Sequence, residues 1–275
     1  MFTAISPGAL GLHVASVDEA IKIARKTGFE GVEVSIHEIA DRIDREGVAA
    51  VRALFEESGI RPAGWGMPVD FRGDDAHFQE GLAMLPRLAK AGQSIGCTRT
   101  MTWILPCSDT MPYDEHRAFL IGRFAPIARI LGDFDCRFGL EFIGPKTLRE
   151  SQKYPFIYKM EDMLALGEDI GPNVGLLLDS WHLFTSGGSP NDLLKVDQKR
   201  IVYVHVNDAP EGLTMDQYVD FERGLPGATG VIPIGDFLRA LHAIGYDGPV
   251  VPEPFGGPAS WAADAMRAIW KQAGL

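Results

Sequence analysis

The sequence predicts an α/β fold, a single (β/α)8 TIM barrel of eight parallel strands surrounded by helices. Two observations support this prediction. Strand-like and helix-like segments alternate along the whole chain, and such alternation is typical of parallel sheets with helical crossovers. The chain has 275 residues, a length at which barrels of this class commonly form one domain. We therefore expect residues 1–275 to form one TIM-barrel domain.

The expected strands are short apolar runs. Apolar residues fill consecutive positions in these runs, as in strands that are buried on both faces. From the N-terminus the runs cover residues 2–6, 31–36, 61–65, 99–104, 137–142, 174–179, 201–206 and 249–253.

Amphipathic stretches separate these runs and predict helices. The first covers residues 16–27, where Ser16 is suited to cap the start of a helix and Gly28 to end it. The connection 208–233 is too long for an ordinary turn and predicts an active-site loop. The other expected helices cover residues 48–58, 80–95, 114–131, 159–170, 234–244 and 261–270.

Composition excludes several classes of protein. The net charge of −11 disfavours nucleic acid, whose phosphates require a basic surface. No apolar stretch approaches the roughly 20 residues that cross a bilayer, and the N-terminus has no signal-peptide pattern. Three cysteines without a C-x-x-C pair argue against disulfides and thiolate zinc sites. We expect reduced cysteines and a cytoplasmic protein.

Four polar residues stand at the ends of four successive apolar runs. They are Glu141 in RFGLEF, Asp179 in VGLLLDSWH, His205 in IVYVHVND and Glu253 in PVVPEPF. Taken singly, each acid also fits a helix cap or a solvated turn, and His205 fits a buried core histidine. Strand ends meet at one mouth of a barrel, so we expect the four side chains to converge. Three carboxylates and an imidazole suit one divalent ion, such as Mn²⁺, Co²⁺, Mg²⁺ or Zn²⁺.

Several longer motifs resemble a known family, the sugar phosphate isomerase/epimerase group of xylose isomerase-like TIM barrels, which includes ketose 3-epimerases and inosose-converting enzymes. The resemblance covers nearly the whole chain. It implies that Glu141, Asp179, His205 and Glu253 bind the metal and that Glu141 and Glu253 also form the acid/base pair. The motifs that carry it are GFEGVEVS (28–35), GLEFIGPKT (139–147), LLLDSWHLFTSGG (176–188), VYVHVNDAP (202–210) and RGLPGATGVIPIGDFLRALHAIGYDGPVVPEPF (223–255).

The same resemblance implies contacts with a substrate. His182 stands where similar epimerases carry a substrate-binding histidine, and Arg223 precedes GLPG, where the family tends to have an arginine that faces the substrate. Ketose 3-epimerases tend to have a glutamate near Lys146, and a lysine there suits a more anionic or carbonyl-like group. Each of these three residues also fits an ordinary surface loop.

Spacing adds further candidates for the site. Asn207 follows His205 closely and is suited either to orient ligands or to bind sugar hydroxyls. Trp103, at a strand end, is suited to pack against the apolar C–H face of a sugar or to cap the core. Glu33 and His37 flank the second strand and fit pocket lining or barrel packing equally well.

The predicted chemistry is proton transfer next to a carbonyl group. Such a transfer needs a base, an electrophile and usually a second acid or base, and a divalent ion stabilises the developing enediolate. We therefore expect a metal-dependent isomerase or epimerase of a keto-sugar or related polyol. The main alternative is a lyase, such as an inosose dehydratase or an enzyme that cleaves 3-keto-glycosides, because the first step is shared.

Two other functions fit less well. A phosphodiesterase of the endonuclease IV type needs more histidines and a basic DNA-binding face, whereas this chain has seven histidines and a net charge of −11. A sugar-binding barrel without catalysis would not need all four candidate ligands. The expected partner is a small carbohydrate, with neither nucleic acid nor membrane involved, and the sequence is compatible with a homo-oligomer.

Overall fold

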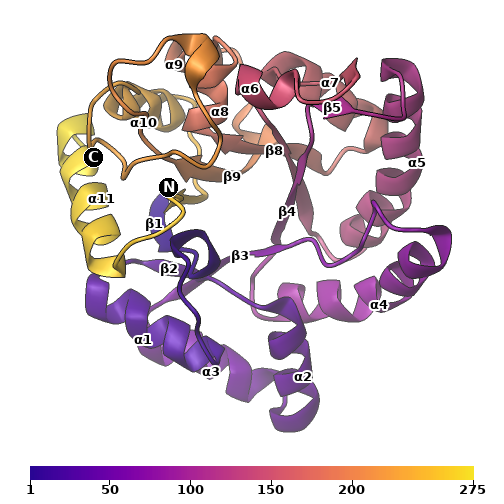
Figure 1. Cartoon of the computed structure of the whole chain (residues 1–275). Helices are drawn as coiled ribbons and strands as arrows, with labels where there is room; N and C mark the ends of the chain where they lie inside the picture. The colour runs from indigo at the N-terminus through magenta and orange to yellow at the C-terminus, as the bar shows by residue number, and fades with distance from the viewer.

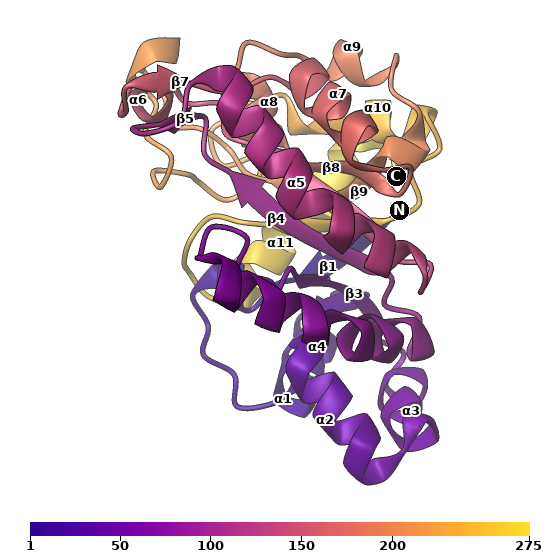
Figure 2. The ribbon, with the colours of Figure 1, turned by 90° about the vertical axis from the view of Figure 1, so that its right-hand side faces the viewer.

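The computed structural model describes residues 1–275 and contains a closed barrel of eight parallel strands, in the order β1-β10-β9-β8-β6-β4-β3-β2. Figure 1 shows the helices surrounding the strands, and Figure 2 shows the molecule from the side. The last helix returns beside the first, and the Arg267 side chain donates a hydrogen bond to the Thr27 carbonyl there. The predicted barrel is therefore confirmed.

The observed strands follow the apolar runs closely. Four of them, β4, β6, β8 and β9, begin and end at the predicted residues. The barrel strands are β1 (Phe2–Ile5), β2 (Gly31–Glu33), β3 (Arg61–Gly66), β4 (Arg99–Ile104), β6 (Arg137–Phe142), β8 (Val174–Asp179), β9 (Ile201–Val206) and β10 (Pro249–Pro252). A separate antiparallel pair, β5 (Cys107–Ser108) and β7 (Tyr154–Pro155), was not predicted.

The second strand is shorter than predicted, because a helix begins where residues 34–36 were expected to continue it. Ser35 caps α2 (Ile36–Glu46), and its hydroxyl accepts a hydrogen bond from the Glu38 amide. Local capping thus ends the apolar run GVEVSI early. The prediction of a strand over residues 31–36 was wrong in its last three residues.

The seven predicted helices are all present, with shifts at their ends that are largest in α4, which begins at Asp75 and not at residue 80. Ser16 caps the first of them, and Gly28 ends it in the left-handed conformation, with a φ of 87°. These helices are α1 (Val17–Thr27), α3 (Val48–Ser58), α4 (Asp75–Ser94), α5 (Tyr113–Gly132), α7 (Met160–Ile170), α10 (Ile234–Ala243) and α11 (Ala259–Ala273). Besides α2, the short elements not predicted are η1 (Gly8–Leu10), α6 (Lys146–Arg149), α8 (Ser180–Thr185), α9 (Pro190–Leu193), η2 (Gln198–Arg200) and η3 (Met215–Gln217).

The core has two parts, one between the strands and the helices and one inside the barrel. Because side chains alternate along a strand, residues two positions apart face the same side. Asp179, His205 and Glu253 each follow an interior residue by two positions. They therefore lie above the barrel core, at the C-terminal mouth. The interior residues are Phe2, Ala4, Ala63, Met101, Leu177, Tyr203 and Val251.

The three cysteines are buried and unpaired, as expected from their number and spacing. None of the helices combines the length and the apolar character needed to cross a bilayer.

Candidate metal centre

The four residues at the strand ends converge. Glu141, Asp179, His205 and Glu253 each offer one ligand atom, and these atoms all lie within 4.8 Å of one another. They come from β6, β8, β9 and the residue after β10, which are consecutive neighbours around the barrel. A register shift between Leu176 and Leu177 brings Asp179 level with His205. The convergence expected from the sequence is thus present in the fold.

Several polar atoms of this cluster have no hydrogen-bond partner. Glu141 Oε1 and both ring nitrogens of His205 are buried and unpaired. His205 Nδ1 lies 3.2 Å from Glu253 Oε2 and 3.6 Å from Glu141 Oε1, but the groups are not aligned for hydrogen bonds. Each unpaired buried group costs about 1–3 kcal/mol. A cation bound among them would satisfy Glu141 Oε1 and one ring nitrogen of His205, so the residues present fit a metal ion.

Asn207 links two of the acids. Its Nδ2 donates to Asp179 Oδ1 and Oδ2 at 3.1 and 3.0 Å, and its Oδ1 accepts a hydrogen bond from the Glu253 amide at 3.0 Å. The Asp179 side chain also caps α8 through the Trp181 amide at 2.8 Å. Asn207 is completely buried. Of its two predicted roles, the geometry supports orientation of the acids.

Arg223 lies at the cluster and is almost completely buried. Its Nη1 donates to Asp179 Oδ2 and Glu253 Oε2, both at 2.7 Å, and its Nη2 donates to Asp220 Oδ1 at 2.8 Å. Burial opposes its charge, yet Asp179 and Glu253 raise the pKa of Arg223 above its ordinary value. A solvated loop arginine, the alternative left open by the sequence, does not match these contacts.

His182 lies beside Arg223 and is completely buried. The Gly144 amide donates to its Nδ1 at 3.1 Å. Burial, together with Arg223, holds the pKa of His182 well below its ordinary value. Nε2 lies 3.0 Å from Arg223 Nη2. Arginine can only donate, and a neutral imidazole has one acceptor nitrogen, so the ring accepts from Gly144 at Nδ1 or from Arg223 at Nε2.

The two glutamates have opposite pKa shifts. Burial raises the pKa of Glu141 to about 8. Burial also opposes ionisation of Glu253, but His205 and Arg223 outweigh it and lower the pKa of Glu253. His205 itself is buried, yet Glu253 and Glu141 raise its pKa well above the ordinary value. These shifts belong to the metal-free cluster, and the positive charge of a bound cation would lower the pKa of both carboxyl groups.

The connection 208–233, which was predicted to be an active-site loop, contacts the cluster through Arg223. Asp208 anchors this loop from the end of β9. It is completely buried, and it exchanges backbone hydrogen bonds with Gly224. Its carboxylate accepts hydrogen bonds from the backbone amides of Ala209, Thr229, Gly230 and Ile232.

Two predicted residues lie farther out. The Lys146 ammonium is 2.6 Å from Asp216 Oδ2 and joins α6 to η3, and none of its ion pairs involves the cluster. Trp103 pairs in register with Glu141, and its side chain is exposed. The Arg72 guanidinium stacks on the Trp103 ring at 4.1 Å. Trp103 therefore stands at the rim of the mouth.

Sequence reasoning missed Asp220. This acid is 9% exposed and lies three residues before Arg223, whose guanidinium it binds. The spacing was visible in the sequence, but no regular element marks this part of the loop.

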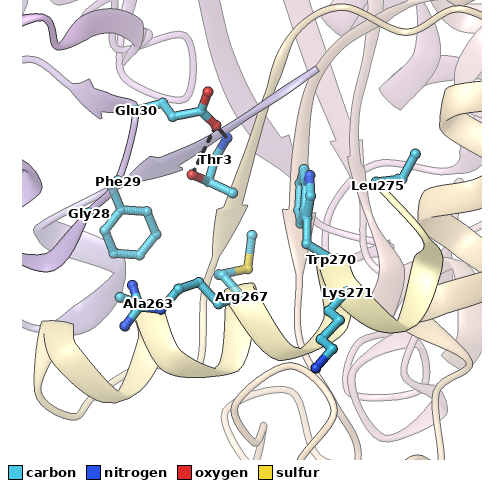
Figure 3. A pocket seen from close by; sticks show the side chains of 10 residues that line it. Thr3, Gly28, Phe29, Glu30, Ala263, Arg267, Trp270, Lys271 and Leu275 are labelled. Atoms are coloured by element: carbon cyan, nitrogen blue, oxygen red, sulfur yellow. Dashed lines mark hydrogen bonds between the residues drawn. The ribbon is translucent and has the colours of Figure 1, made fainter.

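A separate cavity of about 440 Å³ lies between α11 and the turn before β2 (Figure 3). None of its lining residues belongs to the cluster.

A family model described as xylose isomerase-like TIM barrel matches residues 21–272. The chain belongs to this family. Among relatives in the family, an inosose isomerase of Halalkalibacterium halodurans is 22% identical over 95% of this chain and 90% of its own length. A ketose 3-epimerase of Arthrobacter globiformis is 31% identical over 39% of this chain and 34% of its own length. A 3-dehydroshikimate dehydratase of Pseudomonas aeruginosa is 35% identical over 30% of this chain and 13% of its own length.

Solved structures show the same xylose isomerase-like fold. A xylose isomerase domain protein from Alicyclobacillus acidocaldarius is 30% identical and has a TM-score of 0.88, with 100% of both chains covered. The IOLI protein with a zinc atom is 19% identical and has a TM-score of 0.77, covering 100% of this chain and 98% of its own. A D-psicose 3-epimerase is 20% identical and has a TM-score of 0.70, covering 99% of this chain and 96% of its own. The relatives are isomerases, epimerases and dehydratases, and this chain is an enzyme.

Proposed function

We propose that this protein is a divalent-metal-dependent isomerase or epimerase of a keto-sugar or related polyol. The observation that carries the proposal is the convergence of Glu141, Asp179, His205 and Glu253 at the mouth of the barrel. The inosose isomerase and ketose 3-epimerase relatives support the substrate class.

The four converging residues would hold the metal ion. Three carboxylates and one imidazole suit Mn²⁺, Co²⁺, Mg²⁺ or Zn²⁺, and the zinc atom in the IOLI protein supports a metal in this fold. When bound, the ion would supply positive charge that polarises a carbonyl group. The choice among the four ions stays a prediction from the sequence, as does the cytoplasmic location.

Glu141 and Glu253 would transfer the proton. They come from the two ends of the run β6, β8, β9, β10, so they approach the centre from different sides. One carboxylate takes the proton from the carbon next to the carbonyl, and the other returns a proton to the opposite face. This arrangement inverts the configuration at that carbon, which is an epimerisation.

His182 and Arg223 would position the substrate. His182 Nε2 and Arg223 Nη2 are 3.0 Å apart, and a substrate oxygen in contact with this pair would accept a hydrogen bond from Arg223. Trp103 at the rim would cover the apolar face of the sugar. Lys146 stays a predicted contact for the far end of the substrate. To make this contact, its ammonium group would first have to release Asp216.

A lyase on the same site is the second candidate. It is favoured by the 3-dehydroshikimate dehydratase relatives, since a dehydratase also removes a proton next to a carbonyl and then expels a leaving group. Such an elimination needs an acid aimed at the leaving group, and Lys146 or His182 would serve.

The reaction can be tested with a panel of substrates in D₂O. The metal-loaded enzyme would be incubated with keto-sugars, inososes and keto-glycosides, and the products analysed by NMR and mass spectrometry. We expect deuterium at the carbon next to the carbonyl and an isomeric product of unchanged composition. Loss of water or of an aglycone would establish the lyase. Absence of exchange with every substrate would contradict both and favour a binding protein.

A further inference from the structure

The metal centre occupies only one half of the barrel mouth. Its residues come from β6, β8, β9 and β10, so a substrate held there must face β1–β4 on its other side. The residues at or beside the ends of these four strands include Ser6, Glu33, Gly66 and Trp103. Glu33 is the only charged one of the four, and the mechanism proposed above does not use it.

Backbone geometry directs Glu33 into the barrel. The register between β2 and β3 shifts between Val32 and Glu33, since Val32 pairs with Pro62 and Glu33 with Gly64. Such bulges change the direction of a side chain and are frequent beside active sites. Val32 packs in the outer core, whereas Glu33 Oε2 accepts a hydrogen bond from the Tyr203 hydroxyl inside the barrel at 3.3 Å.

Tyr203 holds Glu33 from across the barrel. It is completely buried on β9, two residues before His205, and its ring contacts the His205 ring edge-on with centroids 5.6 Å apart. Gly64 leaves room for the Tyr203 ring, because a Cβ at this position would lie 2.7 Å from that ring. Gly64 thus makes space for Tyr203, and Tyr203 holds the Glu33 carboxyl group in place.

The Glu33 side chain is set to face a ligand. The residue is neither fully buried nor exposed. Glu33 accepts a hydrogen bond from the Tyr203 hydroxyl, and it forms no ion pair. A carboxyl group placed in this way binds a hydroxyl well, whereas a carboxylate or phosphate of a substrate would meet a like charge.

We propose that Glu33 binds a hydroxyl group of the substrate on the side that faces away from the metal centre, and that Tyr203 positions it. The preferred substrate is then a neutral polyhydroxylated ketone and not an anionic one. This inference rests on the proposed function and names the substrate class for the same site.

Binding and turnover of a neutral inosose, with 3-dehydroshikimate as the anionic probe, test the inference in the metal-loaded enzyme. We expect Glu33→Gln to raise the inosose Kd, measured by calorimetry, about 10-fold or more, the loss expected for a hydrogen bond to a charged group. KM should rise in parallel and kcat should change less. Tyr203→Phe should raise Kd in the same direction by a smaller factor. The ratio of the 3-dehydroshikimate Kd to the inosose Kd should be lower in Glu33→Gln than in the wild type.

Two control variants match these changes. Glu30→Gln alters the acid just before the same strand, where it accepts a hydrogen bond from the Thr3 amide (Figure 3). Tyr246→Phe removes another buried hydroxyl, which donates to the Pro249 carbonyl. Both should bind inosose like the wild type. Wild-type affinity in Glu33→Gln, equal losses in the controls, or no inosose binding by the wild type would overturn the inference. Binding without conversion would instead contradict the proposed function.

Discussion

Replacement of Glu253 by glutamine is expected to slow exchange of the substrate hydrogen with solvent by at least about 100-fold, the lower range for a positioned acid or base. Glutamine has nearly the same shape, and its amide oxygen can still accept a hydrogen bond from Arg223, which now donates at 2.7 Å. It cannot take up a proton at neutral pH. Substrate binding should therefore change much less than exchange, which NMR in D₂O measures directly.

Metal content must be measured in the same Glu253→Gln samples, because Glu253 is also a proposed ligand. Glu168→Gln provides a control, since Glu168 forms an ion pair with Arg200 away from the centre. It should exchange substrate hydrogen like the wild type. Undiminished exchange in metal-replete Glu253→Gln would assign the base to another residue: Glu141, the other carboxylate of the pair, or else His182 or Lys146.

Asp179→Asn is expected to weaken metal binding by at least about 100-fold and to reduce turnover accordingly. Contacts that only orient ligands typically account for 10–100-fold in affinity, and Asp179 is itself a proposed ligand. The fold should survive, because asparagine caps helices about as well as aspartate and can still cap α8. Arg223 also keeps its contacts with Glu253 and Asp220. Calorimetric titration of the metal-free variant with Mn²⁺ measures the loss.

The matched control for this change is Asp74→Asn. Asp74 caps α4 through the His77 amide, so the two substitutions make the same chemical change at a helix start, and only one lies at the centre. Asp74→Asn should bind Mn²⁺ like the wild type. If Asp179→Asn keeps full activity after chelation and readdition of metal, Asp179 is not a ligand.

Strand positions could be predicted from the sequence because buried parallel strands are continuous apolar runs. The runs that carry Glu141, Asp179 and His205 have no competing local signal, and their strands begin and end at the predicted residues. In a barrel, all C-terminal strand ends lie at the same mouth, so a residue at such an end is placed there as well. The convergence of the four polar residues was therefore predictable from position alone.

Contacts made by loops were less predictable. Ser35 begins a helix inside an apparent strand, since a capping serine can override an apolar run. Arg223 reaches Asp179 across 44 residues of sequence, and its path depends on the anchoring of the loop by the buried Asp208. Alternation turns Glu33 inward after Val32, but its hydrogen bond from Tyr203 is a tertiary contact that apolar patterning does not reveal. Each case reflects tertiary hydrogen bonding without a periodic signal.

Anomalous diffraction from crystals of the Mn²⁺-loaded enzyme tests the central claim most directly, because it locates the ion without reference to activity. We predict one peak per chain, in contact with Glu141, Asp179, His205 and Glu253, and loss of that peak in Asp179→Asn crystals grown at the same metal concentration. Crystals of active, metal-loaded enzyme with no peak among these four side chains, or with the peak held by other residues, would contradict the account.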